Sequence, residues 1–203
     1  MLVSAILLAA GQSKRMGRVK QLLPLGQSTI VERTIDNLLH STIGETIVVL
    51  GYREEEIRKT ITDKPVKIAI NPHYRQGIST SIIAGLKQID QRARAVLIAL
   101  GDQPFIDSHT INSLVEAFTA HRKGIVIPVY LGRRGNPVIF AIRYKGELLN
   151  LKGDVGGRGI IRRHLDDVLE VAVNCEGVLL DIDTMENYDS MTFNPDKQKD
   201  QKG

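Results

Sequence analysis

LVSAILLAAGQSKRMGRVK, residues 2–20, passes from an apolar run of strand length into a turn rich in small and basic residues. The apolar run is far shorter than the roughly 20 residues that a membrane span needs. The basic residues follow the run, whereas those of a signal peptide precede it. A buried first strand over Leu2 to Ala9 is therefore predicted, with the turn at its carboxyl end.

Apolar runs of similar length recur along the chain, with helical patterns between them. This alternation predicts an α/β fold with a largely parallel sheet that is covered on both faces. We expect one domain over residues 1–193 and a polar, disordered tail over residues 194–203. The later predicted strands are Thr46 to Leu50, Val66 to Ile70, Ala95 to Leu100, Ile125 to Val129, Pro137 to Ala141, Leu169 to Val173 and Val178 to Ile182.

Three stretches between these strands have the apolar spacing of helices. The first follows Thr29, and Glu32 three residues later completes a capping-box pattern. The second follows residues 79–81, and the third follows Asp107 and Ser108. Their apolar positions are Val31, Ile35, Leu38 and Leu39, then Ile82, Ile83, Leu86 and Ile89, then Ile111, Leu114, Val115 and Phe118.

Composition narrows the classes of function. The net charge is +4, but the basic residues are not interleaved with aromatic ones, so we expect no nucleic-acid partner. Because the apolar runs are short, we also expect no membrane partner. The single cysteine, Cys175, excludes an internal disulfide and is expected to be a buried filler in a cytoplasmic protein. Small molecules that carry polyphosphate fit the charge pattern better.

The turn after the first strand has the chemistry of a phosphate site. Ligands of open α/β sheets bind beyond the carboxyl ends of the strands. Around Gly11 the backbone amides can approach an anion closely, while Arg15 and Lys20 can neutralise a triphosphate. Five residues separate Gly11 from Gly17, which excludes a Walker A loop, and the G-x-G-x-x-G spacing is absent. The alternative is an ordinary strand-to-helix turn with solvated cations.

Acidic residues stand near the ends of two later strands. Asp102 directly follows the strand over residues 95–100, in Gly101-Asp102-Gln103-Pro104, and Asp181 and Asp183 stand near the end of the strand over residues 178–182. Magnesium is commonly held by one or two carboxylates together with phosphates and water. We therefore expect Asp102 and Asp183 to share one magnesium ion. Turn or helix-capping roles are the alternatives.

Two further loops are rich in residues that let a ligand approach the main chain. One is Gly77-Ile78-Ser79-Thr80-Ser81, and the other is GDVGGRG over residues 153–159. Both are predicted to lie near a bound ligand.

The signature L-A-A-G-x-S-x-R-M-G-x-x-K over Leu8 to Lys20, with the G-D-Q-P segment, resembles the MobA-like nucleotidyltransferases. Within that family it is most similar to the molybdenum cofactor cytidylyltransferases. The resemblance implies a three-layer Rossmann-like nucleotidyltransferase fold with a mainly parallel (mixed) sheet. It covers nearly the whole chain except the tail, and its other matching segments are Asn71-Pro72 and residues 77–81, 134–138, 153–158 and 181–188.

The resemblance also implies roles for particular residues. Arg15, Lys20 and Asp102 are the implied catalytic residues, the first two on phosphates, and Asp102 and Asp183 are the implied magnesium ligands. The loop over residues 77–81 is expected near the base and ribose, and the loop over residues 153–158 toward a pterin-bearing acceptor. The implied nucleotide-binding residues are Leu8, Ala9, Ala10, Gly11, Ser13, Lys20, Gly77, Ser79, Ser81 and Asp102.

The implied activity is transfer of a nucleoside monophosphate from an NTP to the phosphate of molybdopterin or molybdenum cofactor, with release of pyrophosphate. Ala10 favours CTP, because guanylyl-transferring relatives usually read L-A-G-G where this chain reads L-A-A-G. A molybdoenzyme client is a further implied partner. Asn136 departs from the histidine that relatives commonly carry before Pro137, so recognition of the acceptor at this segment stays open.

Three other functions are weighed against this interpretation. A sugar-1-phosphate nucleotidyltransferase would use the same metal and phosphate chemistry with another acceptor. A non-catalytic chaperone that binds the molybdenum cofactor would not need both Asp102 and Asp183. A dinucleotide-dependent oxidoreductase would need the glycine spacing that this chain lacks.

Overall fold

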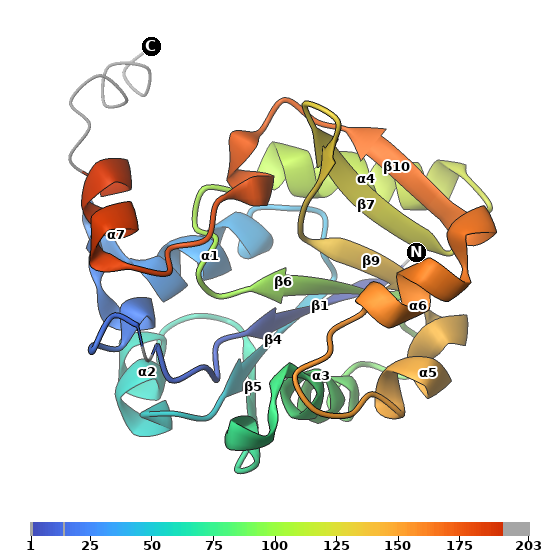
Figure 1. The fold of residues 1–203 in the computed structure, drawn as a ribbon. Coiled ribbons are helices and arrows are strands. Elements are labelled where there is room, and N and C mark those ends of the chain that lie inside the picture. Colours follow the sequence, from blue (N-terminus) through green and yellow to red (C-terminus); the bar gives the residue numbers. More distant parts are fainter. Residues whose placement is uncertain (1, 14, 193–203) are drawn as a thin grey trace.

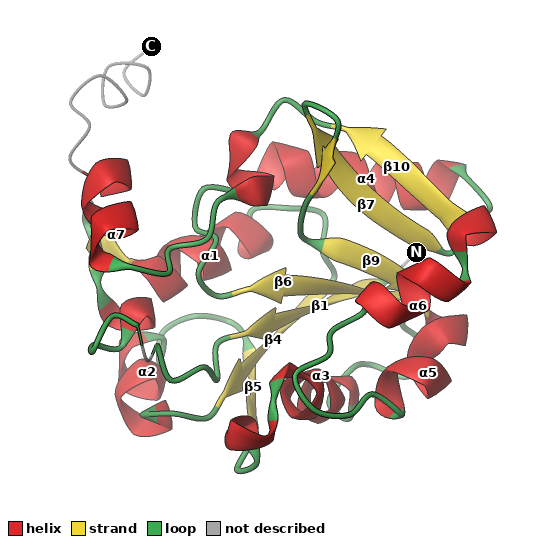
Figure 2. Ribbon diagram, in the orientation of Figure 1, coloured by secondary structure: helices red, strands yellow, loops and turns green. Residues whose placement is uncertain are grey.

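A central mixed sheet organises the computed structural model, which describes residues 2–13 and 15–192 (Figures 1 and 2). Its strand order is β10-β7-β9-β6-β1-β4-β5, and the short β8 pairs with β7. Pairing is parallel except where β9 meets β6 and β7 and where β8 meets β7. The strands are β1 (Val3–Leu8), β4 (Glu45–Leu50), β5 (Lys67–Ile70), β6 (Ala95–Leu100), β7 (Ile125–Tyr130), β8 (Arg133–Arg134), β9 (Val138–Ala141) and β10 (Val168–Ala172), and β2 (Pro24–Leu25) and β3 (Ser28–Thr29) form a separate hairpin.

The first strand lies at the centre of the sheet, between β4 and β6. Almost every residue of these three strands is buried, because helices cover both faces, and this explains their unbroken apolar runs. The chain first adds strands on the β4 side of β1 and then on the β6 side. The predicted α/β class with a mainly parallel, mixed sheet is confirmed, and the reversal of strand order at β1 is where such sheets bind ligands.

Helices α1 and α4 pack together on one face of the sheet, and α3 and α5 on the other (Figure 1). The predicted capping box of Thr29 and Glu32 is present at the start of α1, and Asp107 caps α4 by accepting a hydrogen bond from the Thr110 N–H. The helices are α1 (Ile30–Leu39), α2 (Glu54–Thr60), α3 (Ile78–Leu86), α4 (Ser108–Ala120), α5 (Lys145–Leu149), α6 (Arg158–Arg163) and α7 (Met185–Thr192). Within the described residues, no helix is long and apolar enough to span a membrane.

Helix α3 begins earlier than the sequence pattern predicts. Gly77 is its N-cap residue, so residues 79–81 lie in the first helical turn and do not precede it. Gly77 has a φ of 108°, a conformation that side chains rarely adopt, and its side chain cannot cap the helix. A carboxylate from a distant loop accepts a hydrogen bond from the first turn instead, as described below.

The predicted strand over residues 178–182 is wrong. Residues Glu176–Leu179 form a 3-10 helix, and the chain then continues without a ladder to the start of α7. Gly177 packs against the backbone of Phe105, and the Val178 carbonyl accepts a hydrogen bond from the Asn136 N–H. The apolar run therefore reflects burial in a tight turn. Asp181 and Asp183 therefore do not stand near the end of a strand, as the sequence predicts, but in the connection between the 3-10 helix and α7.

Cys175 and the C-terminal tail were also the subject of predictions from composition. Cys175 is buried, as expected of a filler residue. The polar tail predicted over residues 194–203 lies outside the described residues.

Candidate nucleotide-binding site

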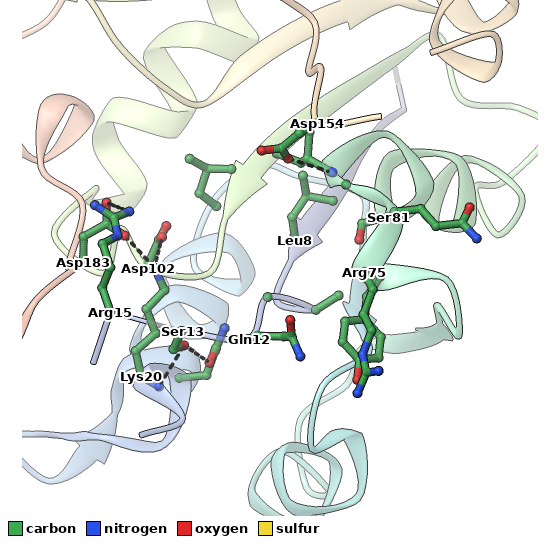
Figure 3. A pocket seen from close by; sticks show the side chains of 18 residues that line it. Leu8, Gln12, Ser13, Arg15, Lys20, Arg75, Ser81, Asp102, Asp154 and Asp183 are labelled. Atoms are coloured by element: carbon green, nitrogen blue, oxygen red, sulfur yellow. Dashed lines mark hydrogen bonds and ion pairs between the residues drawn. The ribbon is translucent and has the colours of Figure 1, made fainter. Parts of the chain in front are cut away.

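A cavity of about 650 Å³ opens at the carboxyl ends of β1 and β6, beside the first turn of α3. Figure 3 shows two groups of polar side chains in it. Arg15, Lys20, Asp102 and Asp183 gather on one side, and Arg75, Ser81 and Asp154 lie on the other. The full lining consists of Leu8, Ala10, Gly11, Gln12, Ser13, Arg15, Lys20, Gln21, Tyr74, Arg75, Gln76, Gly77, Ile78, Ser81, Leu100, Asp102, Asp154 and Asp183.

The loop after β1 folds back on itself around Ser13. Ser13 has a φ of 50°, its carbonyl accepts from the Met16 N–H, and its hydroxyl oxygen accepts from the Lys20 N–H at 3.3 Å. Met16 packs with Leu23, Ile30 and Ile182 in a small apolar cluster separate from the main core. Because Met16 follows Arg15 and Ile182 precedes Asp183, this cluster anchors both segments at the mouth of the cavity.

Four charged side chains converge at this mouth. The Lys20 ammonium lies 2.5 Å from Asp102 Oδ2 and 2.9 Å from Asp183 Oδ1, and Arg15 donates to Asp183 Oδ2 at 2.9 Å. The Lys20 side chain is only 11% exposed, whereas that of Arg15 is 70% exposed. Residues from the first loop, the end of β6 and the segment before α7 thus meet, as the sequence predicts for their carboxylates and cations.

The mutual attraction of these groups is visible in their pKa values. Burial acts to lower the pKa of Lys20, but Asp102 and then Asp183 outweigh it, so the pKa is raised above its ordinary value of 10.5. Burial likewise acts to raise the pKa of Asp183, but the hydrogen bond and charge of Lys20 and the charge of Arg15 lower it below its ordinary value. The pKa of Asp181 is raised, first by burial and then by repulsion from Asp102 and Asp183. All three carboxyl groups therefore lie within electrostatic reach of one another.

The donor set at this mouth fits a divalent cation. Asp102 Oδ1 is buried and has no hydrogen-bond partner among the described residues. Asp102 and Asp183 already bind one cation between them, the ammonium group of Lys20. Carboxylate oxygens are the ligands that hard divalent ions prefer. No group of three or more metal-ligating side chains occurs within the described residues, so phosphates and water would complete the coordination.

The opposite side of the cavity is formed where a loop closes over the start of α3. Asp154 Oδ1 accepts from the Ile78 N–H at 3.2 Å, and the Gly153 carbonyl accepts from the Ser79 N–H at 3.3 Å. A Cβ atom on Gly77 would stand 2.3 Å from the Gly153 carbonyl carbon, so only glycine permits this approach. We call this contact between residues 77–79 and 153–154 the loop clasp.

The Ser81 hydroxyl at the same side is oriented by Asn71. The buried Asn71 side chain donates to Ser81 Oγ and to Thr80 Oγ1, at 2.9 Å in each case. Because Ser81 Oγ accepts this bond, its own proton is available to a ligand in the cavity.

A second cavity, of about 520 Å³, adjoins the first. Ile78, Leu100 and Asp154 line both cavities, so the loop clasp forms part of the wall between them. The second cavity has an apolar floor and a polar rim. Its floor includes Ile82, Val138 and Phe140, and its rim includes Asn136, Arg158 and Arg162.

The structure brings most of the predicted site residues to the first cavity. Among the implied nucleotide-binding residues, Ala9 and Ser79 are the exceptions, because both are buried and neither lines the cavity. Ala9 donates its N–H to the Val49 carbonyl, and its methyl group faces Gly101. The predicted residues that do line it are Leu8, Ala10, Gly11, Ser13, Arg15, Lys20, Gly77, Ser81, Asp102 and Asp183.

Several lining residues were not singled out from the sequence. Residues 74–76 form a 3-10 turn that enters the cavity just before Gly77, and Gln12 lies at a variable position of the signature. Asp154 stands inside a loop that was predicted to lie near a ligand. The sequence signal that could have found Arg75 is its place beside a loop of small residues, where a cation would meet a phosphate-bearing ligand.

A sheet with a cavity at its switch point, lined by two carboxylates and two cations, is the arrangement that the sequence predicts for a nucleotidyltransferase. The model of the MobA-like NTP transferase domain matches residues 5–168. This match covers most of the chain, and the chain therefore belongs to the MobA-like NTP transferase family.

Known relatives of similar length agree with the family but differ in their named activities. Molybdenum cofactor cytidylyltransferase of Escherichia coli K12 is 27% identical over 92% of this chain and 93% of its own length. Nicotine blue oxidoreductase of Paenarthrobacter nicotinovorans is 29% identical over 91% of this chain and 93% of its own length. Relatives at this level of identity thus have different named activities, and the similarity does not identify the substrates of this chain.

Solved structures show the same arrangement of the chain. Rv0371c of Mycobacterium tuberculosis superposes with a TM-score of 0.86 at 28% identity, covering 95% of this chain and 98% of its own. A second structure of Rv0371c, in complex with manganese, gives a TM-score of 0.81 at 26% identity, with the same coverage.

Proposed function

We propose that this protein transfers a nucleoside monophosphate, with CMP favoured, from an NTP to the phosphate of a molybdopterin or molybdenum cofactor acceptor and releases pyrophosphate. The observation that carries the proposal is the convergence of Lys20, Asp102 and Asp183 at the mouth of a cavity sized for a nucleotide. A molybdoenzyme that receives the product belongs to the same proposal, as does a cytoplasmic setting.

Magnesium is the metal proposed for the two carboxylates. Asp102 and Asp183 would hold it, and the unpartnered Asp102 Oδ1 supports this choice of ligand. When bound, the ion would neutralise negative charge on the phosphates. The structural relative Rv0371c was solved in complex with manganese, which supports the binding of a divalent metal by this protein.

The nucleotide would lie across the first cavity. Arg15 and Lys20 would bind the phosphates at one side, because both are cations at the mouth. The base and ribose would lie toward Ser81 and the loop clasp, where hydroxyl and backbone groups can form hydrogen bonds. Ala10 next to Gly11 supports CTP as the preferred nucleotide.

The acceptor would occupy the second cavity. Its apolar floor suits the flat ring system of a pterin, and Arg158 and Arg162 on its rim suit anionic substituents. Asn136 would provide amide hydrogen bonds at the position where relatives commonly carry histidine.

In the proposed reaction, an oxygen of the acceptor phosphate attacks the α-phosphorus of the NTP. The new P–O bond forms as the bond to the β-phosphate oxygen breaks, and the electron pair leaves with pyrophosphate. The nucleophile is already an anion, so the protein need not remove a proton. The work of Arg15 and Lys20 is to hold the phosphates in line and to reduce their charge repulsion.

The deciding experiment measures pyrophosphate release from CTP, GTP or UTP with magnesium and the pterin acceptor. Fastest release with CTP is expected, together with the largest thermal shift for CTP among the nucleotides. Release with a sugar 1-phosphate and not with the pterin would favour the sugar nucleotidyltransferase, and cofactor binding without turnover would favour the chaperone. Redox turnover of nicotine blue in place of pyrophosphate release would overturn the proposal in favour of the activity named for the Paenarthrobacter relative.

A further inference from the structure

The segment over residues 181–183 is held beside the end of β6 without being part of the sheet. Two contacts tie it there. The Ile182 N–H donates to the Asp102 carbonyl at 3.0 Å, and the Gln103 side-chain amide donates to Asp181 Oδ1 at 2.7 Å. Asp102 and Asp183 therefore lie close together because hydrogen bonds join the two segments that carry them. Strand pairing does not hold these segments together.

The Gln103 side chain is unusual for a buried polar group. Gln103 is 1% exposed, yet its Oε1 atom has no hydrogen-bond partner among the described residues. Leaving a buried amide oxygen unpaired is unfavourable, and an apolar side chain of similar size would avoid this. Packing alone thus does not account for glutamine here, whereas the directed bond to Asp181 does.

Asp181 accepts this hydrogen bond, and we call the bond between Gln103 and Asp181 the tether. Asp181 is exposed as a residue, although its carboxyl group is partly buried where it meets Gln103. It does not line the first cavity, and one oxygen of its carboxylate accepts the hydrogen bond from Gln103. The next residue, Ile182, is buried in the small apolar cluster, and Asp183 after it lines the cavity. Holding Asp181 in place therefore restricts the backbone that carries Asp183.

We infer that Gln103 is a positioning residue, which through Asp181 sets the separation of the Asp102 and Asp183 carboxylates so that they can receive one divalent cation. This inference rests on the metal site of the proposed function. It assigns Asp181 the role of an anchor and leaves metal ligation to the other two aspartates.

A matched pair of variants at one exposed position tests this tether. Asp181→Asn and Asp181→Ala both remove the charge, but only asparagine keeps an oxygen for Gln103. Binding of Mn²⁺ alone to the full chain is measured by electron paramagnetic resonance, which does not depend on turnover. Asp181→Ala is expected to bind Mn²⁺ about 10-fold more weakly than Asp181→Asn, the size typical of losing a group that orients a metal ligand.

Gln103→Met removes the same bond from the buried side. It is expected to weaken Mn²⁺ binding about as much as Asp181→Ala does, and the double variant is expected to be no weaker than either, since both remove one interaction. Circular dichroism shows whether each variant folds. If Gln103→Met does not fold, the pair at the exposed position still gives the answer.

The outcomes separate this inference from the metal site itself. Equal Mn²⁺ affinity of Asp181→Asn and Asp181→Ala would overturn the tether, even where Asp102→Asn abolishes binding and so supports the metal site. No Mn²⁺ binding by the unmodified protein would overturn the metal site and the tether together.

Discussion

The Lys20 ammonium lies 2.5 Å from Asp102 Oδ2, with its side chain almost enclosed, and it also contacts Asp183. One lysine thus forms an ion pair with both carboxylates that we propose as metal ligands. A divalent cation that binds them must compete with this ammonium. The position of Lys20 therefore links two of its proposed roles, as partner of the acids and as ligand of the phosphates.

Replacing Lys20 separates these roles. Lys20→Met should tighten the binding of Mn²⁺ in the absence of nucleotide, because the competing cation is gone. The same variant should lower turnover by about 10²-fold or more, the loss typical when a group that stabilises developing charge is removed. Mn²⁺ titration and pyrophosphate release measure the two effects. Weaker Mn²⁺ binding would show that Lys20 supports the metal and does not compete with it.

Replacing Asp102 tests the metal site directly. Asp102→Asn should cut turnover by orders of magnitude and abolish Mn²⁺ binding, since the amide lacks the negative charge of the carboxylate. The fold should persist, because Asp102 lies at the end of a strand at the cavity mouth. Circular dichroism provides the control for folding. Normal turnover in a folded variant would remove Asp102 from the site.

The loop clasp should fail when Gly77 is replaced. Gly77→Ala places a methyl group 2.3 Å from the Gly153 carbonyl carbon at a φ of 108°, so it should destabilise the protein by more than about 1 kcal/mol and weaken NTP binding. Urea unfolding and nucleotide titration measure both. Gly146→Ala in α5 is the matched control, because its methyl group meets nothing within 4 Å. Equal unfolding free energies and equal NTP affinities of the two variants would contradict a role for the loop clasp.

The rim of the second cavity should govern acceptor affinity. Arg162→Ala is expected to raise the KM for the pterin acceptor by about 10-fold, the loss of a charge-assisted hydrogen bond, with the KM for NTP unchanged. The neighbouring Arg163 pairs with Glu147 and does not line the cavity, so Arg163→Ala should leave both constants unchanged. Steady-state kinetics with each substrate varied in turn would decide this. If Arg162→Ala raised only the KM for the NTP, the acceptor would not bind in the second cavity.

A partly buried network around Glu45, at the start of β4, predicts that stability depends on pH. Glu45 accepts from Ser4 Oγ, the Asp90 N–H and Lys67, and although burial acts to raise its pKa, these hydrogen bonds lower it below the ordinary 4.5. A lowered pKa in the folded state stabilises the protein above pH 4.5, and this contribution is lost as the pH falls through the folded-state value.

Glu45→Gln should therefore destabilise the protein by about 1–3 kcal/mol near neutral pH. The difference in the free energy of unfolding between the variant and the unmodified protein should decrease progressively as the pH falls below 4.5. Urea unfolding over a pH series measures this, with Glu116→Gln, an exposed glutamate of α4, as the control. A difference that increases at low pH would contradict the lowered pKa of Glu45.

The sheet and half of the site could be predicted because they depend on local patterns. Unbroken apolar runs mark strands covered on both faces, and the residues directly after β1 and β6 include Gly11 and Asp102, which must lie at the ligand edge of such a sheet. The capping residues Thr29 and Asp107 were found for the same reason, since their hydrogen bonds join residues three apart.

The parts that failed depend on contacts between distant segments. Val178 is apolar because it is buried in a turn against the β8–β9 connection, and a strand pattern cannot be told from this by composition. The start of α3 is set by Gly153 and Asp154, which lie more than 70 residues further along the chain. Arg75 reaches the cavity through a 3-10 turn that has no periodic signal.

One carboxylate of the site lies late in the chain. The sheet is complete at β10, which ends at Ala172, whereas Asp183 follows the last strand and also lies beyond the residues that match the family model. During translation, a nascent chain that has emerged only as far as β10 contains the loop after β1 and Asp102 but lacks Asp183. The C-terminal segment must therefore be synthesised before both of the acids that we propose as metal ligands are present.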